Sequence, residues 1–499
     1  MPGNVLRGRR NLWAFTAGTI AVSLGVILHL PMFIMARDMG YRLAAMPMDP
    51  AMLWGMALIV VGVGLAAYGL LPDPKAPLAP TMKGVSALDW SQDRLTRAHL
   101  GLMVVLVVGL VIDVMKPASL GFVVPGMIAE YGVSRATVAW APFSALVGAA
   151  IGSVAWGVAA DLFGRRASIL IAAMMFVGTS ICGAMPSFWW NVGMCFLMGA
   201  AAGGMLPVTY ALLAEVMPLK SRGWSLVLVG GLGAAGGYLL ASGLSAALQP
   251  IFGWRIMWLL NLPTGLILIF LGGFIPESPS FLRLESRTAR GAPTPIAAPG
   301  SNDQAGGAAR TFGLSVGALT WGLINFGLLL WLPANLVAKG YDIGATSRIL
   351  SQSAILALPT SVAAAVLYGR WSAKWSLVAS MAATMAGVIG VLHLEQVRGA
   401  SGTPVLTISL LIVGLNALIA TVLPYAAENY DLRIRARGTG WVAACTKSGG
   451  IVAQFMNIAG AVPPLAVTAG VVIIGLGLAS GLIIRFGGDP RGRLAGVIA

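Results

Sequence analysis

The segment GLVIDVMKPASLGF, residues 109–122, places an acid, a base and a proline inside one apolar run. Asp113 and Lys116 are three residues apart, so a helix would carry both on one face, where they could pair. Pro117 has no backbone N–H, so the carbonyl of Asp113 loses its helical partner and the helix should be weakened there. A buried carboxyl group can exchange a proton, and an ammonium group can attract an anion. An inert ion pair that fixes helix packing is the alternative.

Other polar side chains also interrupt apolar runs. Lys447 would either face a central cavity as a second cation or extend toward the inner membrane surface. Asn325 and Asn416 could hydrogen-bond a solute or a neighbouring helix. Glu130 is expected at the outer end of its helix, on a solvated rim. Together with the first pair, the lysine and the two asparagines predict a site for proton exchange and solute binding.

The composition indicates what kind of protein carries these residues. The chain has 499 residues, of which 58% are hydrophobic and 10% are charged, whereas soluble domains carry about 25% charged residues. A polytopic helical membrane protein is therefore expected. The net charge of +15 is explained by basic loops on the cytoplasmic side, not by nucleic-acid binding.

About fourteen apolar runs approach the 20 or so residues that a helix needs to cross a bilayer. They cover residues 12–34, 52–71, 100–125, 137–160, 167–185, 189–214, 224–248, 256–275, 312–337, 349–368, 376–394, 404–427, 440–461 and 464–484. With the N-terminus inside, most of the 32 Lys and Arg residues fall on the cytoplasmic side, in agreement with the positive-inside rule. We expect an inner (plasma) membrane protein with both termini in the cytoplasm.

Two cytoplasmic linkers divide the runs into three groups. The predicted parts are an N-terminal transmembrane hairpin (1–72), a linker (73–99), an N-half six-helix bundle (100–282), a second linker (283–310), a C-half six-helix bundle (311–486) and a tail (487–499). An internal repeat supports the division into halves. AEVMPLKSRG and AENYDLRIRA each place an Arg seven residues after a Glu, which pairs Glu215 and Arg222 with Glu428 and Arg435. Repeated halves are typical of secondary transporters.

The segment GVAADLFGRR, from Gly157 to Arg166, lies between two of the apolar runs. Asp161 would end one helix and Arg165 would begin the next, with Gly164 allowing a tight turn, so a charge latch could join the two helices. The segment resembles the G-x-x-x-D-R-x-G-R-R signature of the major facilitator superfamily, with Leu in place of the usual first Arg. The resemblance implies a fold of two six-helix halves that rock around a central site.

Further segments resemble other elements of that superfamily. AEVMPLKSRG resembles the element after its fourth helix, which implies that Glu215 and Arg222 exchange ionic partners with the latch. PESPSFL resembles the P-E-S-P-R-W-L element of sugar porters and would place Glu277 at the inner surface, unless this residue is only a helix stop. The second-half copy, LYGRWSAKWS, lacks the Asp, so the N-half latch should dominate. The expected gating residues are Gly157, Asp161, Gly164, Arg165, Arg166, Glu215, Arg222, Glu277, Glu428 and Arg435.

The segment WGLINFGLLLWLPANL, residues 321–336, resembles the seventh helix of proton-linked metabolite symporters. These include aromatic-acid, niacin-type and synaptic-vesicle-glycoprotein-like members, and niacin-type symporters often carry an acid near the position of Asp113. The Gln-rich and P-E-T elements of sugar porters are missing, and VGGLGAAGGYLLASG lacks the Gly-Pro of drug exporters. The resemblance covers residues 95 to about 485 and leaves out the first two helices.

The sequence thus predicts an all-α major facilitator fold of six plus six helices with two extra N-terminal transmembrane helices. The predicted function is secondary active transport of a small organic solute, an organic anion, by proton-coupled symport with alternating access. A proton-coupled exporter and a non-transporting sensor or assembly factor are the alternatives. No catalytic constellation, nucleotide loop, metal site or cofactor site is expected. The expected partners are the solute, protons and the lipid bilayer, and the N-terminal helix pair could bind a protein.

Overall fold

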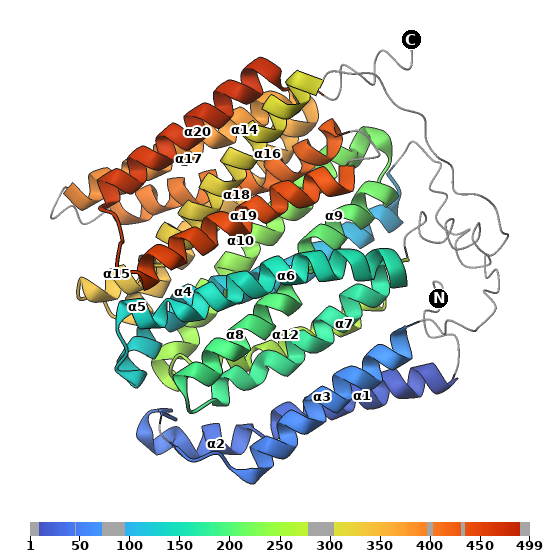
Figure 1. Ribbon diagram of the computed structural model, residues 1–499, viewed down its shortest axis with the longest axis vertical. Coiled ribbons are helices and arrows are strands. Elements are labelled where there is room, and N and C mark those ends of the chain that lie inside the picture. Colours follow the sequence, from blue (N-terminus) through green and yellow to red (C-terminus); the bar gives the residue numbers. More distant parts are fainter. Residues whose placement is uncertain are drawn as a thin grey trace.

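Every regular element of the described chain is a helix (Figure 1). The computed structural model describes residues 9–44, 46–71, 95–277, 304–396, 403–430 and 435–489. Within these ranges no strand is formed. The predicted all-α class is confirmed, because runs of apolar residues must satisfy their backbone hydrogen bonds internally if lipid surrounds them.

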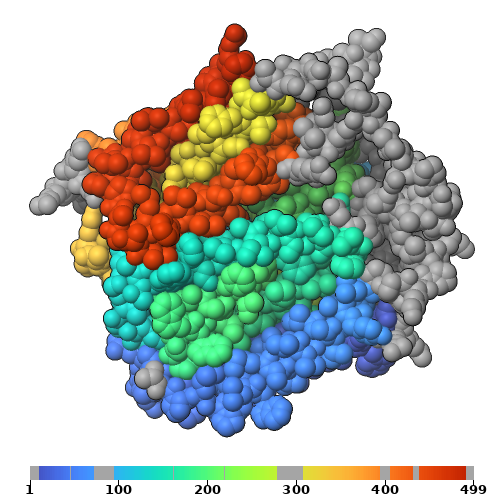
Figure 2. All heavy atoms as spheres, in the orientation of Figure 1, coloured from blue at the N-terminus to red at the C-terminus, as the bar shows by residue number. Residues whose placement is uncertain are grey.

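The N-terminal hairpin packs against the flank of the N-half, on α7 (Arg165–Gly178). It consists of α1 (Arg9–Ile27), α2 (Leu30–Met35), the 3₁₀ helix η1 (Ala36–Met39) and α3 (Pro50–Leu70). Figure 2 shows the hairpin as a separate layer beside the N-half, away from the C-half. Any effect of the hairpin on the centre of the molecule therefore has to pass through the N-half.

Glycines allow α1 and α3 to approach closely. A Cβ atom built at Gly25 would lie 2.6 Å from the carbonyl oxygen of Gly55, and one built at Gly18 would lie 2.6 Å from that of Gly62. Small residues at the contact let helix backbones pack tightly in a membrane, where burial of apolar surface drives association little. The glycines therefore hold the hairpin together through close van der Waals contact.

The N-half is formed by residues 97–272. Its elements are α4 (Arg97–Tyr131), α5 (Arg135–Val138), α6 (Trp140–Phe163), α7, η3 (Thr179–Ala184), α8 (Phe188–Ala202), α9 (Met205–Val216), α10 (Leu219–Phe252), α11 (Ile256–Leu259) and α12 (Asn261–Gly272). The first of these, α4, continues as a helix through Pro117 and Pro125 and ends at Gly132, which has a left-handed conformation. The expected weakening at Pro117 does not interrupt this helix.

The C-half is formed by residues 304–486 and packs along the N-half. Its elements are α14 (Gln304–Leu323), the π-helical segment η4 (Ile324–Leu329), α15 (Leu332–Ala338), α16 (Ile343–Arg370), α17 (Ala373–Gln396), α18 (Thr403–Asn429), α19 (Arg435–Ile458) and α20 (Leu465–Phe486). Helix α10 of the N-half packs along α16 and α18, and α6 packs along α19 (Figure 1). These contacts leave a central space bounded by both halves.

Twelve of the described helical segments are long and apolar enough to cross a membrane. The predicted count of fourteen is not confirmed, because two predicted runs fall below these limits. The run 256–275 forms only a shorter apolar segment, Ile256–Gly272. The run 440–461 forms α19, which is 24 residues long but carries polar side chains such as Thr446 and Gln454. These two are buried in protein, so the helix is less apolar than its neighbours.

Candidate functional site

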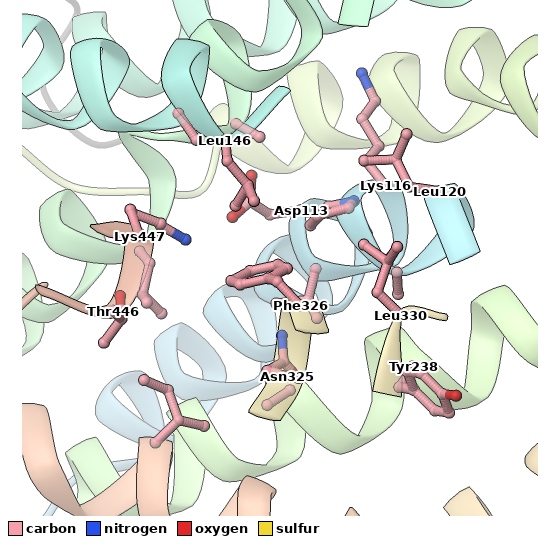
Figure 3. A pocket seen from close by; sticks show the side chains of 18 of the residues that line it. Asp113, Lys116, Leu120, Leu146, Tyr238, Asn325, Phe326, Leu330, Thr446 and Lys447 are labelled. Carbon is pink, nitrogen blue, oxygen red and sulfur yellow. The ribbon is translucent and has the colours of Figure 1, made fainter. Parts of the chain in front are cut away.

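A cavity of about 160 Å³ lies between the two halves (Figure 3). Helices α4, α6, α8, α9 and α10 form its N-half wall, and α14, η4, α15, α18 and α19 form its C-half wall. One water molecule needs about 10–15 Å³ of such space, so the cavity could hold about ten waters or a small organic molecule of similar size. Aromatic side chains line much of it: Phe122, Tyr210, Tyr238, Trp321 and Phe326.

Asp113 lines this cavity from the middle of α4 and is 5% exposed. Its carboxylate forms no hydrogen bond or ion pair with any described residue, and its buried Oδ1 has no partner. An ionised group at membrane depth costs about 2.5–3.5 kcal/mol on insertion scales, and more when no partner compensates it. The position therefore favours either a protonated acid or an approaching cation, and the proton-exchange role stays a prediction.

The predicted pair between Asp113 and Lys116 is not formed. Nζ of Lys116 donates to the carbonyl oxygen of Phe176 at 2.9 Å and to Oγ1 of Thr179 at 3.0 Å. In Figure 3 the lysine side chain points away from Asp113. The reason is local: α7 changes to η3 at Thr179, and helix ends leave carbonyl groups that need donors. Lys116 is 1% exposed, and its long side chain reaches these acceptors rather than its neighbour on α4.

Lys447 reaches the cavity from α19 in the C-half. Its Nζ lies 5.7 Å from the centroid of the Phe326 ring, and it forms no hydrogen bond or ion pair with a described residue. Its amine is directed toward Asp113 across the cavity (Figure 3), and the two groups interact electrostatically. The alternative in which Lys447 extends to the inner membrane surface is therefore wrong.

The π-helical segment η4 forms part of the C-half wall. Such segments are rare and often lie at functional sites. Gln454 of α19 holds this one in place: its Nε2 donates to the carbonyl oxygen of Phe326 at 2.5 Å, and its Oε1 accepts from Nε1 of Trp331 at 3.1 Å. Asn325 of η4 lines the cavity, and its role in solute binding stays a prediction. Sequence reasoning missed Gln454, although a glutamine inside an apolar run is a signal that could have revealed it.

Two further polar groups of the wall lack partners among the described residues. Nδ2 of Asn416 in α18 is buried without an acceptor, and the hydroxyl of Tyr238 in α10 has no partner. The cavity therefore presents the acid Asp113, the amine of Lys447, two amides and two phenols in a mostly apolar and aromatic lining. In the described part of the chain, no group of three or more His, Cys, Asp or Glu residues could hold a metal ion.

Several predicted gating residues of the N-half meet where α6, α7 and the end of α12 come together. Glu277 accepts hydrogen bonds from the backbone N–H groups of Arg165 at 2.6 Å and Arg166 at 3.5 Å. A negative charge at the N-terminus of α7 is favourable, because the helix dipole is positive there. Gly164 makes the turn with φ +98°, and a Cβ at this position would lie 2.6 Å from Oε2 of Glu277. Glu277 therefore does more than stop a helix.

The repeated glutamates have different partners in the two halves. Oε1 of Glu215 lies 3.4 Å from Nη2 of Arg165, which also donates through Nη1 to the carbonyl oxygen of Ala160 at 2.6 Å. In the C-half, Oε2 of Glu428 accepts from the hydroxyl of Tyr368 at 2.6 Å. Each glutamate of the repeat thus lies near the end of a helix, Glu215 in α9 beside Arg165 and Glu428 in α18 beside Tyr368.

Four other gating predictions stay predictions. The side chains of Asp161 and Arg435 lie outside the described residues, so the Asp161 latch is not tested. Arg222 lies half-buried near the start of α10. Gly157 lies within α6, and a Cβ built there would meet no atom within 4 Å, so packing alone does not require glycine at this position.

The acid that was expected on a solvated rim, Glu130, is buried instead. Its Oε1 lies 2.7 Å from Nη2 of Arg255, and the two side chains are 4% and 0% exposed. Glu130 also accepts from Nε1 of Trp254 at 2.8 Å and from the backbone N–H groups of Leu43 at 2.7 Å and Ala44 at 2.9 Å. This carboxylate therefore joins α4, α11 and the turn of the hairpin, a long-range contact that spacing along the sequence does not show.

The chain is similar to known transport proteins over most of its length. The model of the Major Facilitator Superfamily matches residues 102–454. The niacin transporter NiaP of Acinetobacter baylyi is 26% identical over 392 residues, which cover 72% of this chain and 86% of that protein. The 4-hydroxybenzoate transporter PcaK of Pseudomonas putida is 32% identical over 185 residues, which cover 35% of this chain and 40% of that protein.

Solved structures agree with the fold. The xylose transporter XylE from E. coli, in a partially occluded inward-open conformation, superimposes with a TM-score of 0.62 and 16% sequence identity, and the match covers 79% of this chain and 99% of that one. At this identity the similarity supports the fold and not the solute. The hairpin precedes residue 102 and lies outside the family match.

Proposed function

Because the chain belongs to the Major Facilitator Superfamily and is a secondary transporter of a small organic solute, we propose that it carries a small aromatic carboxylate together with a proton. One observation carries this proposal. Asp113 and Lys447 face one cavity from opposite halves, and neither forms a hydrogen bond or ion pair with a described residue. Both groups are therefore available to a proton and to a solute.

The charges of Asp113 and Lys447 explain how movement of the proton and of the solute would be coupled. In the empty carrier, ionised Asp113 and Lys447 compensate each other across the cavity. A proton on Asp113 leaves Lys447 as a buried charge without a counterion, which is a costly state. A solute carboxylate at Lys447 restores neutrality. A carrier loaded with only the proton or only the anion would bring an uncompensated charge into a low-dielectric environment, so the two are carried together.

The remaining wall suits a flat ring. Trp321 and Phe326 supply aromatic surfaces on which a ring can pack in offset or edge-to-face geometry. The free amide of Asn416 can donate to a ring substituent or ring nitrogen, and the hydroxyl of Tyr238 can bond a further polar group. The names of the relatives, which transport niacin and 4-hydroxybenzoate, support the same solute class.

Uptake by the purified protein in proteoliposomes with an imposed pH gradient tests this proposal. The probes are nicotinate, 4-hydroxybenzoate and the neutral compound nicotinamide. We expect the wild type to accumulate at least one carboxylate and to prefer nicotinate to nicotinamide. Lys447→Gln should weaken carboxylate binding by about 10- to 100-fold, since a hydrogen bond to a charged group contributes about 1.5–3 kcal/mol.

Asp113→Asn should abolish accumulation driven by the proton gradient, while exchange of labelled for unlabelled solute survives. Lys339→Gln is the matched control, because Lys339 is exposed beyond the end of α15 and should leave uptake unchanged. Preference for nicotinamide, or full accumulation by Asp113→Asn, would contradict the proposal. Efflux driven by the proton gradient without uptake would favour an exporter, and the absence of any flux would favour a non-transporting role.

A further inference from the structure

Arg135 connects the two halves at the end that is predicted to face outward. It is the first residue of α5, which lies between α4 and α6 of the N-half. Its Nη1 donates to Oδ1 of Asn335 at 2.9 Å, and its Nε donates to Oδ1 of Asn457 at 3.2 Å. Both asparagines belong to the C-half, on α15 and α19. One side chain of the N-half thus holds two helices of the C-half.

The C-half presents a prepared surface to this guanidinium. Nδ2 of Asn457 donates to the carbonyl oxygen of Ala453 at 2.9 Å, which leaves its Oδ1 to accept from Arg135. The guanidinium carbon of Arg135 also lies 4.4 Å from the centroid of the Trp331 ring, within the range of a cation–π interaction. The planar fork of arginine suits such a site, whereas lysine would act only as a point charge.

The contact continues to the cavity through Trp331. The indole N–H of Trp331 donates to Gln454, which in turn donates to the carbonyl oxygen of Phe326 in η4. The ring of Phe326 lies beside Lys447. A chain of direct contacts therefore joins Arg135 to the wall that carries the cavity lysine, and it passes through the π-helical segment.

Neighbouring contacts show that the halves meet closely at this end. The hydroxyls of Ser245 on α10 and Ser347 on α16 are 2.7 Å apart. A Cβ atom built at Gly121 on α4 would lie 2.6 Å from the carbonyl oxygen of Leu330. If the halves rock apart at this end, all of these contacts must break. Arg135 is largely exposed, so water can replace its hydrogen bonds and the cost of breaking them stays small.

We infer that Arg135, Asn335, Asn457 and Trp331 form an outer latch, which holds this end closed and releases when the cavity opens outward. The latch acts on the conformational equilibrium and does not depend on which solute is carried. Because η4 lies between the latch and the cavity, opening of the latch also frees the segment that carries Phe326.

Labelling of a cysteine placed in the cavity tests the latch without any solute. Ala118→Cys puts a reporter thiol on the cavity wall, and the three native cysteines are buried, with their background measured in the chain without the reporter. A membrane-impermeant maleimide is added to each side of oriented vesicles in turn. Arg135→Gln should speed labelling from the outer side by at least about fivefold, the change that about 1 kcal/mol gives in a two-state equilibrium.

Arg348→Gln is the matched control. Arg348 is exposed on α16 at the same end, and its Nε donates to the carbonyl oxygen of Gly344 in its own helix. This variant loses the same charge without breaking a contact between the halves, so its labelling rate should equal that of the wild type. Adding Asn457→Ala to Arg135→Gln should increase the labelling rate little further, because Arg135→Gln already removes the hydrogen bond between these two residues.

Two results would contradict the outer latch. One is a labelling rate in Arg135→Gln that equals that of the wild type, and the other is an increase of the labelling rate in Arg348→Gln as large as that in Arg135→Gln. If Arg135→Gln does not fold, Arg135→Lys provides the same test, since it keeps the charge but loses the two-sided fork and should give an intermediate increase. Failure here would leave the proposed solute class untouched, because no solute is used.

Discussion

The two halves of the bundle hold their buried polar groups by different chemistry. The N-half uses a buried ion pair, Glu130 with Arg255 at 2.7 Å, and a buried ammonium, Lys116, bonded to a carbonyl and a hydroxyl. In the C-half, the segment η4 beside the cavity is held by neutral groups, the indole of Trp331 and the amide of Gln454. Hydrogen bonds with a charged partner are roughly twice as strong as neutral ones.

This difference indicates which half is more rigid. The buried charges of the N-half, in the Glu130–Arg255 pair and on Lys116, bond within it or to the hairpin, so we expect these parts to move as one body. The C-half contains the π-helical segment η4 and holds it by neutral bonds, which cost less to rearrange. Lys447 and three of the four residues of the outer latch belong to the C-half, so local change during transport should be concentrated there.

The largest expected effect comes from breaking the buried pair of the N-half. Glu130→Gln should lower the free energy of unfolding by about 3–5 kcal/mol, because it leaves the guanidinium of Arg255 buried without a counter-charge. Thermal unfolding of the purified protein in detergent measures the change. The variant should also loosen the hairpin, whose Leu43 and Ala44 donate to the same carboxylate.

Glu215→Gln is the comparison for that variant. Its pair with Arg165 is partly exposed, at 23% and 13% for the two side chains, so its loss should cost less than about 1 kcal/mol. Equal decreases in the free energy of unfolding of the two variants would show that burial does not make the Glu130–Arg255 pair more important for stability.

A smaller effect on the free energy of unfolding should distinguish the roles of the two buried lysines, Lys116 and Lys447. Lys116→Met should lower the free energy of unfolding by about 1 kcal/mol, since the carbonyl of Phe176 loses its charged donor. Lys447→Met should cost less, because Lys447 has no hydrogen bond to lose and Asp113 can become neutral by taking up a proton once the ammonium group is gone. Unfolding measurements are combined with uptake of nicotinate and nicotinamide. Only Lys447→Met should change the preference for the carboxylate, and a change in Lys116→Met alone would reverse the assignment of the two roles.

The smallest effect concerns the end of the C-half that is predicted to face the cytoplasm. Tyr368→Phe removes the hydroxyl that donates to Glu428 at 2.6 Å and should cost about 1 kcal/mol or less, because Glu428 is only half-buried and water can replace the donor. Thermal unfolding is again the measurement. Tyr425→Phe on α18 is the comparison, because the hydroxyl of Tyr425 donates to a neutral acceptor, the carbonyl oxygen of Gly488 at 2.9 Å. A loss as large as that of Glu130→Gln would contradict the view that the C-half is held by weaker bonds.

Much of the fold followed from the sequence for one reason. Lipid penalises both exposed backbone and charge, so apolar runs, their glycine-rich contacts and the few embedded charges are visible without a structure. That is why Asp113 and Lys447 stand out from their types alone, although the sequence left open whether Lys447 faces a cavity or the inner membrane surface. The repeat also placed Glu215 and Glu428 at equivalent corners of the two halves.

The tertiary structure decided which groups meet. Spacing of three residues put Asp113 and Lys116 on one face of α4. The lysine side chain is long enough to reach the end of α7, and only the folded chain shows that the carbonyl oxygen of Phe176 lies within its reach. Glu130 lies far from Arg255 and Leu43 along the chain, so no local pattern could predict that it is buried. The sequence by itself determined which residues must avoid lipid, because the free-energy cost of exposing a side chain to lipid depends on the residue type alone. Their partners depend on distances between helices, which only the folded chain sets.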